Sequence, residues 1–416
     1  LALLLLPAAC AALGFTGLGA ARLRIASLLA GAVMLTCAAL TAVVPELAGW
    51  SLAGGLLRMN AFSAPLPALA AGLWLFSVAV TPRMTLDQSG LQRAAATTAL
   101  TTLTFLSESA WLIALAWAAS VFLLTPGQGA PHRARAWLWG SVALLSLGAA
   151  LLTLPQARGT WAETLGLVAV ALACGVRIGL APLHAWMPAL FDHGPLGPSI
   201  LFCAPQLGTY VMAVLVVPRA APELLRAVAV VALVTAVYAA ALALTQRSAR
   251  RAVAYLLISQ SGLVAAGLDC TSEEALTGAL VLWLAASLAF AGLARSVLVL
   301  EARRGRLDLG RHYGGYARKP LLAISFLLLG LSSTGFPGTL GFVGEELLLG
   351  GATSDFPVLG FLVVATGMLT GLAVLRMYFS LFCGARGDVH RLDLRPREAL
   401  GFAAVVGVLL ITGLLP

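Results

Sequence analysis

Two apolar segments each combine a proline, several glycines and a charge. Residues 174–188 read CGVRIGLAPLHAWMP and residues 335–346 read GFPGTLGFVGEE. The charges of interest are Arg177 in the first segment and Glu345 in the second. A charged side chain at the centre of a bilayer costs about 2.5–3.5 kcal/mol on the mildest scale, so it is usually kept for a function. Two such segments predict a hydrated path for ions.

The composition places the chain among polytopic membrane proteins. Of its 416 residues, 60% are apolar and 10% are charged, whereas roughly a quarter of the residues of a soluble domain are charged. Runs of about 16 to 25 apolar residues are long enough to cross a bilayer. Fourteen such spans are expected, near 1–19, 23–46, 64–82, 91–107, 110–125, 136–154, 161–180, 195–218, 227–245, 252–268, 275–300, 320–350, 356–384 and 398–415. The chain begins with Leu1 rather than Met, and we interpret its first run as a membrane helix rather than a cleaved signal.

The basic residues divide unequally between the loops. Lys and Arg accumulate in cytoplasmic loops. The even-numbered loops hold Arg58, Arg158, Arg219 and Arg226. The odd-numbered loops hold a much larger set, namely Arg22, Arg24, Arg83, Arg93, Arg133, Arg135, Arg247, Arg250, Arg251, Arg303, Arg304, Arg306, Arg311, Arg318, Lys319, Arg386, Arg391, Arg395 and Arg397. This bias predicts that both termini lie outside, and it explains the net charge of +9 without a nucleic-acid partner.

The two broken segments predict an internal repeat. Proline removes a backbone donor and frees carbonyl groups that lipid cannot satisfy, so such breaks occur where protein or water lines a site. Transporters often place them at corresponding points of two inverted repeats. The breaks at Pro182 and at Pro337 with Gly338 lie five spans apart. We therefore expect a single transmembrane domain over 1–416, with two inverted five-helix repeats at about 90–218 and 221–385.

Other features carry less information. The longest polar stretch, about 301–319, is interpreted as a solvated cytoplasmic loop. The six cysteines form no C-x-x-C or Cys/His pattern, and no nucleotide-binding glycine motif is present. No metal or cofactor is therefore expected on this chain.

Three motifs resemble one family in the right order. Residues 176–188 resemble V-K-x-P-x-x-P-L-H-x-W-L-P, residues 250–262 resemble K-R-x-x-A-Y-S-S-I-S-H-x-G, and residues 335–345 resemble G-x-P-G-T-x-x-F-V-G-E. These signatures are typical of the proton-translocating antiporter-like membrane subunits of respiratory complex I (NADH-quinone oxidoreductase chain M) and of the multisubunit cation/proton antiporters. The resemblance implies an all-α fold of about 14 transmembrane helices in which the seventh and twelfth are broken.

The resemblance also implies a chain of buried lysines, histidines and glutamates, because burial and neighbouring charges bring the pKa of such groups near 7. This chain departs from that pattern. Arg177 takes the place of the lysine in the seventh helix, and an arginine stays protonated. Gln206 replaces the lysine of the eighth helix, and Gln260 and Ala286 stand at histidine positions. A glutamine can line a water wire, but it cannot change charge.

The acidic positions are only partly filled. Aligning Trp117 with the family places Ala118 at the acid of the fifth helix, and Glu108 becomes the candidate only if the register shifts by about three turns. Otherwise Glu108 is a surface carboxylate at a helix N-terminus. Glu345 is the best retained acid, and Glu346 beside it points about 100° away.

Two further polar side chains lie in the apolar segments. His184 is expected either to pass protons or to satisfy carbonyl groups freed by the break at Pro182. Arg295 is expected either to lie centrally in its span or, as the simpler account, to extend toward the interface.

Three functions remain open. The first is a proton- or cation-translocating membrane subunit of an NADH-quinone oxidoreductase-like complex, with its redox sites on other chains. The second is an ion-transport subunit without redox partners, as in cation/proton antiporters or inorganic-carbon uptake systems. The third is a scaffold that no longer conducts. For all three we expect partner membrane subunits and an integral location in a bacterial plasma membrane.

Overall fold

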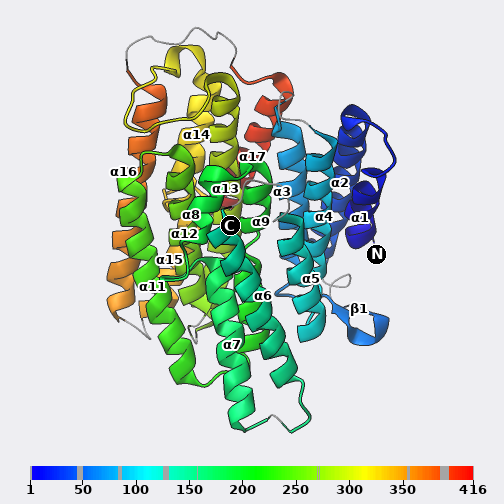
Figure 1. The fold of residues 1–416 in the computed structure, drawn as a ribbon. Coiled ribbons are helices and arrows are strands. Elements are labelled where there is room, and N and C mark those ends of the chain that lie inside the picture. The colour runs from blue at the N-terminus through cyan, green and yellow to red at the C-terminus, as the bar shows by residue number, and fades with distance from the viewer. Residues whose placement is uncertain are drawn as a thin grey trace. The chain divides into compact units, whose positions relative to one another are not determined.

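The computed structural model describes residues 2–44, 50–82, 87–124, 131–156, 158–268, 270, 272–353, 357–384 and 393–415. Almost all of this part of the chain is helical (Figure 1). The helices fall into two compact units. Unit 1 comprises 1–79, 83–178 and 201–224, and unit 2 comprises 80–82, 179–200 and 225–416. The predicted five-helix repeats have different bounds from these units and stay a prediction.

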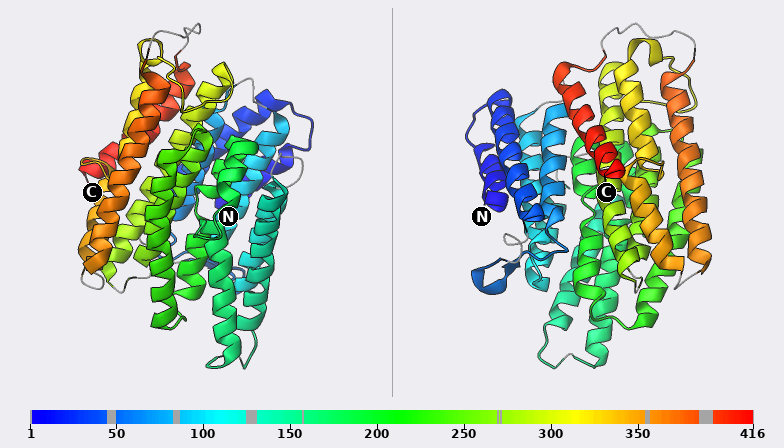
Figure 2. Two further views of the ribbon diagram at one scale, coloured as in Figure 1. Left: turned by 60° about the vertical axis from the view of Figure 1, so that its left-hand side comes forward. Right: turned by 180° about the vertical axis from the view of Figure 1, so that it is seen from behind.

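Unit 1 contains the N-terminal helices and one small hairpin. Its elements are α1 (Ala2–Leu13), α2 (Ala20–Val43), β1 (Ser51–Leu52), η2 (Ala53–Gly55), β2 (Leu57–Arg58), α3 (Pro65–Val80), α4 (Gln88–Phe105), α5 (Ala110–Leu124), α6 (His132–Leu152), α7 (Trp161–Ile178), α10 (Leu207–Val211) and the π-helical turn η4 (Met212–Val216). Strands β1 and β2 pair antiparallel. Helices α6 and α7 run side by side (Figures 1 and 2), and a Cβ on Gly148 would lie 2.9 Å from the Gly166 carbonyl oxygen. The small residue therefore lets these backbones approach closely.

Unit 2 contains the remaining helices. They are α8 (Trp186–His193), α9 (Leu196–Cys203, whose last three residues belong to unit 1), α11 (Pro222–Thr245), α12 (Ala249–Leu268), α13 (Glu273–Arg304), η5 (Tyr316–Arg318), α14 (Pro320–Ser332), α15 (Leu340–Thr353), α16 (Pro357–Phe382) and α17 (Pro396–Leu414). Every residue of α12 is buried except Arg250 and Arg251 at its start. By contrast, α16, orange in Figure 2, exposes Val364, Met368 and Leu372. An apolar exposed face of this kind suits contact with lipid.

The helices agree with the membrane spans that the sequence predicts. Nine segments in the described part of the chain are long and apolar enough to cross a bilayer, and four shorter apolar helices accompany them. Each of the fourteen expected spans coincides with one helix or with a broken series of helices. The protein is an all-α polytopic membrane protein.

Among the described residues, three spans are interrupted. Helix α7 ends at Ile178, where Gly179 has a φ of 90° and the Ala181–Pro182 peptide is cis. Helices α14 and α15 are separated by a turn in which Gly335 and Gly338 have φ values of 64° and 85°. These two breaks were expected. The third was not, and it lies at Gln206, a non-glycine residue with a φ of 52° between α9 and α10. Pro205 precedes it and could have revealed it, because proline cannot donate the backbone hydrogen bond that continues a helix.

Candidate functional site

Arg177 lies at the C-terminal end of α7 in unit 1, with only 5% of its surface exposed. Its Cζ atom stands 3.5 Å from the ring centroid of Phe202 and 4.9 Å from that of Trp117. Its Nη2 donates a hydrogen bond to Ser120 Oγ at 3.3 Å, and its Nη1 is buried without a hydrogen-bond partner. The guanidinium is therefore held by aromatic faces and one hydroxyl, and no carboxylate among the described residues of unit 1 forms an ion pair with it.

Gln206 belongs to the same unit and is 4% exposed. Its Oε1 accepts a hydrogen bond from Thr209 Oγ1 at 3.5 Å, whereas its Nε2 is buried and unpartnered. The segment around it packs closely on α7, since a Cβ on Gly208 would lie 3.1 Å from Arg177 Cβ and 3.0 Å from the Cys174 carbonyl oxygen. Unit 1 thus brings the break at Gln206 next to the turn of α7 that carries Arg177.

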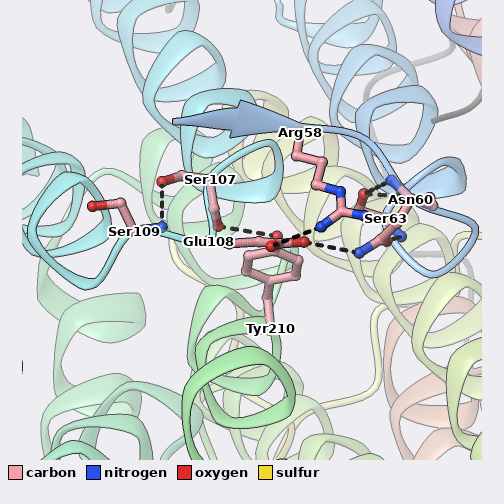
Figure 3. Close-up of polar contacts among 7 residues, drawn as sticks. All are labelled: Arg58, Asn60, Ser63, Ser107, Glu108, Ser109 and Tyr210. Carbon is pink, nitrogen blue, oxygen red and sulfur yellow. Dashed lines mark hydrogen bonds and ion pairs between the residues drawn. The ribbon is translucent and has the colours of Figure 1, made fainter. Parts of the chain in front are cut away.

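Glu108 lies two residues before the start of α5, beside Arg58 and Asn60 (Figure 3). Arg58 Nη1 is 3.8 Å from Glu108 Oε2, and Asn60 Nδ2 donates to Glu108 Oε1 at 3.2 Å. The Tyr210 hydroxyl donates to the carbonyl oxygens of Phe105 and Ser107 at 3.0 and 3.2 Å. The Glu108 side chain is 37% exposed. It therefore does not take the place of a buried acid within α5, where Ala118 follows the Trp117 that contacts Arg177.

Glu345 lies in α15 of unit 2, about two turns after the break at Pro337 and Gly338. Its Oε1 is buried without a hydrogen-bond partner. Its Oε2 packs directly over Gly335, where an added Cβ would lie 2.0 Å away. Glu346 is exposed, so these adjacent acids meet different surroundings.

The Gln260 side chain of α12 lies near the Glu345 carboxyl group. Neither the oxygen nor the nitrogen of its amide forms a hydrogen bond with any described residue, and the residue is fully buried. Unit 2 therefore brings together Glu345 and Gln260, two of the residues that the sequence predicts to line a path.

His184 lies in the turn between α7 and α8 and packs against two tyrosines of unit 2. Its ring centroid is 5.5 Å from that of Tyr238 and 6.1 Å from that of Tyr255. Its Nδ1 is buried and has no hydrogen-bond partner. Nδ1 therefore does not donate to a carbonyl group freed by the break at Pro182, which was one of the two roles expected for His184.

Arg295 does not extend to the interface, which was the simpler of the two positions expected for it. It is 3% exposed, in the C-terminal half of the unit 2 helix α13. Its Nη1 donates to Thr81 Oγ1 at 3.1 Å and its Nη2 to the Gly197 carbonyl oxygen at 3.4 Å. These acceptors come from distant parts of the sequence, which is why no local pattern indicated them.

The sequence matches a known family of membrane proteins and several of its members. Residues 72–370 match the family model described as NADH:quinone oxidoreductase/Mrp antiporter, TM. The chain is 28% identical over 257 residues to NADH-quinone oxidoreductase subunit M of Rickettsia bellii, covering 60% of this chain and 52% of that protein. It is 32% identical over 284 residues to NADH-quinone oxidoreductase subunit 14 of Thermus thermophilus, covering 68% of this chain and 62% of that protein. The chain thus spans about half the length of several curated relatives that it matches.

Two solved structures share the fold. A chain of respiratory complex I from Thermus thermophilus with bound NADH superposes with a TM-score of 0.89 at 23% identity, covering 100% of this chain and 96% of that one. A chain of the Mrp complex from Dietzia sp. DQ12-45-1b superposes with a TM-score of 0.84 at 17% identity, covering 99% and 94%. The family model covers well over half of the sequence. This chain belongs to the NADH:quinone oxidoreductase/Mrp antiporter transmembrane family.

Proposed function

We propose that this chain is a proton- or cation-translocating membrane subunit of a multisubunit, redox-driven complex related to NADH-quinone oxidoreductase. The observation that carries the proposal is the carboxyl group of Glu345, with one oxygen buried and unpartnered and the other against Gly335. A carboxyl group that is kept in an apolar span without a basic partner is suited to taking up and releasing a proton. The names of the relatives support a redox-driven complex, whose quinone and cofactors would lie on partner chains.

Within this proposal the path residues have different roles. Glu345 is the titrating group, and Gln260 and His184 provide polar lining in the same unit. Arg177 provides a fixed positive charge in unit 1, with Gln206 as polar lining. The Glu108 side chain is partly exposed, and its pairing with Arg58 suits an electrostatic role rather than a relay.

The experiment is a flux measurement in sealed vesicles that contain the chain together with its co-purifying membrane subunits. Flux driven by an imposed proton or sodium gradient is compared among the wild type, Glu345→Gln and Arg177→Ala. We expect Glu345→Gln to abolish the flux, because an amide does not exchange its charge. Arg177→Ala should change the flux without abolishing it, since a guanidinium does not titrate.

The environment of Arg177 favours a second candidate, a scaffold that no longer conducts. The guanidinium of Arg177 stays charged and lies over aromatic rings, so it is a poor donor and acceptor of protons. Equal flux in the three proteins would support the scaffold and contradict the translocation proposal. Sodium-driven flux in the absence of any redox subunit would instead support an antiporter or another ion-transport subunit without redox partners.

The orientation and location belong to the same proposal. The bias of basic residues toward the odd-numbered loops supports an orientation with both termini outside. The bacterial relatives support a plasma-membrane location.

A further inference from the structure

Arg177 is a buried cation whose charge the described part of unit 1 leaves unbalanced. Its hydrogen-bond partner Ser120 is neutral, and its other neighbours, Phe202 and Trp117, are aromatic. The ion pairs among the described residues of this unit join Arg58 to Glu108 and Arg93 to Asp87. A buried charge without a counter-charge is unfavourable, because nothing of opposite sign offsets the loss of its hydration. Bound water can hydrate such a group, but it cannot neutralise it.

A second unpartnered donor lies on the segment that packs against the same turn of α7. Gln206 uses its Oε1 to accept from Thr209, which leaves the two N–H groups of Nε2 as donors without an acceptor. The close approach of Gly208 to Arg177 and Cys174 fixes this segment against α7. A buried donor that lacks an acceptor loses its hydrogen bonds to water without replacing them, which is unfavourable.

We infer that Arg177 Nη1 and Gln206 Nε2 together bind a small monovalent anion of the halide class, such as chloride. One positive charge and two sets of N–H donors balance one negative charge. The apolar rings of Phe202 and Trp117 supply no hydrogen-bond donors from their faces that could replace an anion's water, so an anion that gives up its water readily is preferred. Sulfate and phosphate, with more charge and stronger hydration, are disfavoured for the same reason.

The test is a ligand-dependent stability measurement on the purified full chain in vesicles or nanodiscs of zwitterionic lipid. The unfolding midpoint is recorded while sodium chloride or sodium bromide replaces sodium gluconate at constant ionic strength. A ligand that binds only the folded state raises stability with its concentration relative to its Kd. We expect a saturable rise of the midpoint with chloride and bromide and none with sulfate.

Three variants locate the effect. Arg177→Gln and Gln206→Leu should each lose the halide-dependent shift. The matched control is Arg295→Gln, because Arg295 is equally buried but both its Nη1 and its Nη2 donate to protein acceptors, although its Nε has none. That variant should keep the wild-type shift. Absence of a shift in the wild type, or its persistence in Arg177→Gln or Gln206→Leu, overturns the site.

A second experiment uses the wild-type protein alone, so it does not require the variants to fold. Crystals of the wild type grown in bromide are measured at the bromine absorption edge. An anomalous peak in contact with both Arg177 and Gln206 supports the site. Peaks confined to surface arginines would show an adventitious ion only and would overturn it.

Discussion

At the scale of single residues, the surroundings of Glu345 depend on the absence of a Cβ atom at Gly335. Gly335 has a φ of 64°, a conformation that favours glycine, and its Cα faces the Glu345 carboxyl group. An added Cβ would lie 2.0 Å from Glu345 Oε2. The glycine therefore both makes the turn possible and leaves room for the acid.

Gly335→Ala is expected to destabilise the protein and to displace Glu345. The left-handed backbone alone costs an L-residue about 1–2 kcal/mol, and the clash adds to that cost. Unfolding in a denaturing detergent measures the change. Gly371→Ala is the matched control, since an added Cβ there meets nothing within 4 Å and the φ is not positive. An equal effect of the two substitutions would contradict the proposed contact.

The stacking of Arg177 on Phe202 gives a second prediction at this scale. A desolvated cation over an aromatic face contributes about 0.5–2 kcal/mol. Phe202→Leu, Arg177→Met and the double variant should therefore show a favourable coupling energy of that size in a double-mutant cycle of unfolding free energies. Additive single effects would mean that the two side chains do not stabilise each other.

At the scale of elements, small residues bring α13 and α15 into backbone contact. A Cβ on Gly344 would lie 2.6 Å from the Leu282 backbone nitrogen, and one on Gly278 would lie 2.3 Å from the Leu348 backbone nitrogen. Helix association in a membrane relies on such close packing because lipid supplies no hydrophobic drive between helices. This contact positions the helix that carries Glu345.

Gly344→Ala should therefore destabilise the protein by about 1–3 kcal/mol, the usual cost of overpacking. The backbone atoms it would meet cannot rotate away as a side chain can. Gly407→Ala in α17 has nothing within 4 Å of the new Cβ, so its effect should stay within about 0.5 kcal/mol. Similar unfolding midpoints for the two variants would show that α13 and α15 do not require the contact.

The helices were largely predictable from the sequence, and the contacts between them were not. Long apolar runs and the breaks at Pro182 and Pro337 are local signals. The break at Gln206 also had a local signal, Pro205, but it was not predicted. No local signal indicated the side chains that surround Arg177. Ser120 and Trp117 precede it by more than fifty residues, and only the packing of helices brings them together.

At the scale of the whole molecule, the distribution of basic residues predicts how the protein lies in the bilayer. Arg83, Arg386 and Arg391 lie outside the described residues. Arg311, in the loop of 301–319, and Arg219, in a loop of the opposite class, are both exposed. These two positions allow a direct test.

The Arg311→Cys variant should react with a membrane-impermeant thiol reagent only when the reagent has access to the cytoplasmic side of the membrane. The Arg219→Cys variant should react in intact cells. Charge asymmetry in short loops sets this orientation. Each variant is the other's control, and the reverse pattern of labelling would invert the proposed topology.

The central claim, that Glu345 is the group that changes charge during transport, is tested most directly by comparing two adjacent acids. Proton flux through vesicles is measured for Glu345→Gln and Glu346→Gln, which remove the same charge from neighbouring positions of α15. The half-buried Glu345 and the exposed Glu346 differ in surroundings rather than in chemistry. The account predicts that flux is lost in Glu345→Gln and retained in Glu346→Gln; equal flux in both variants would contradict it.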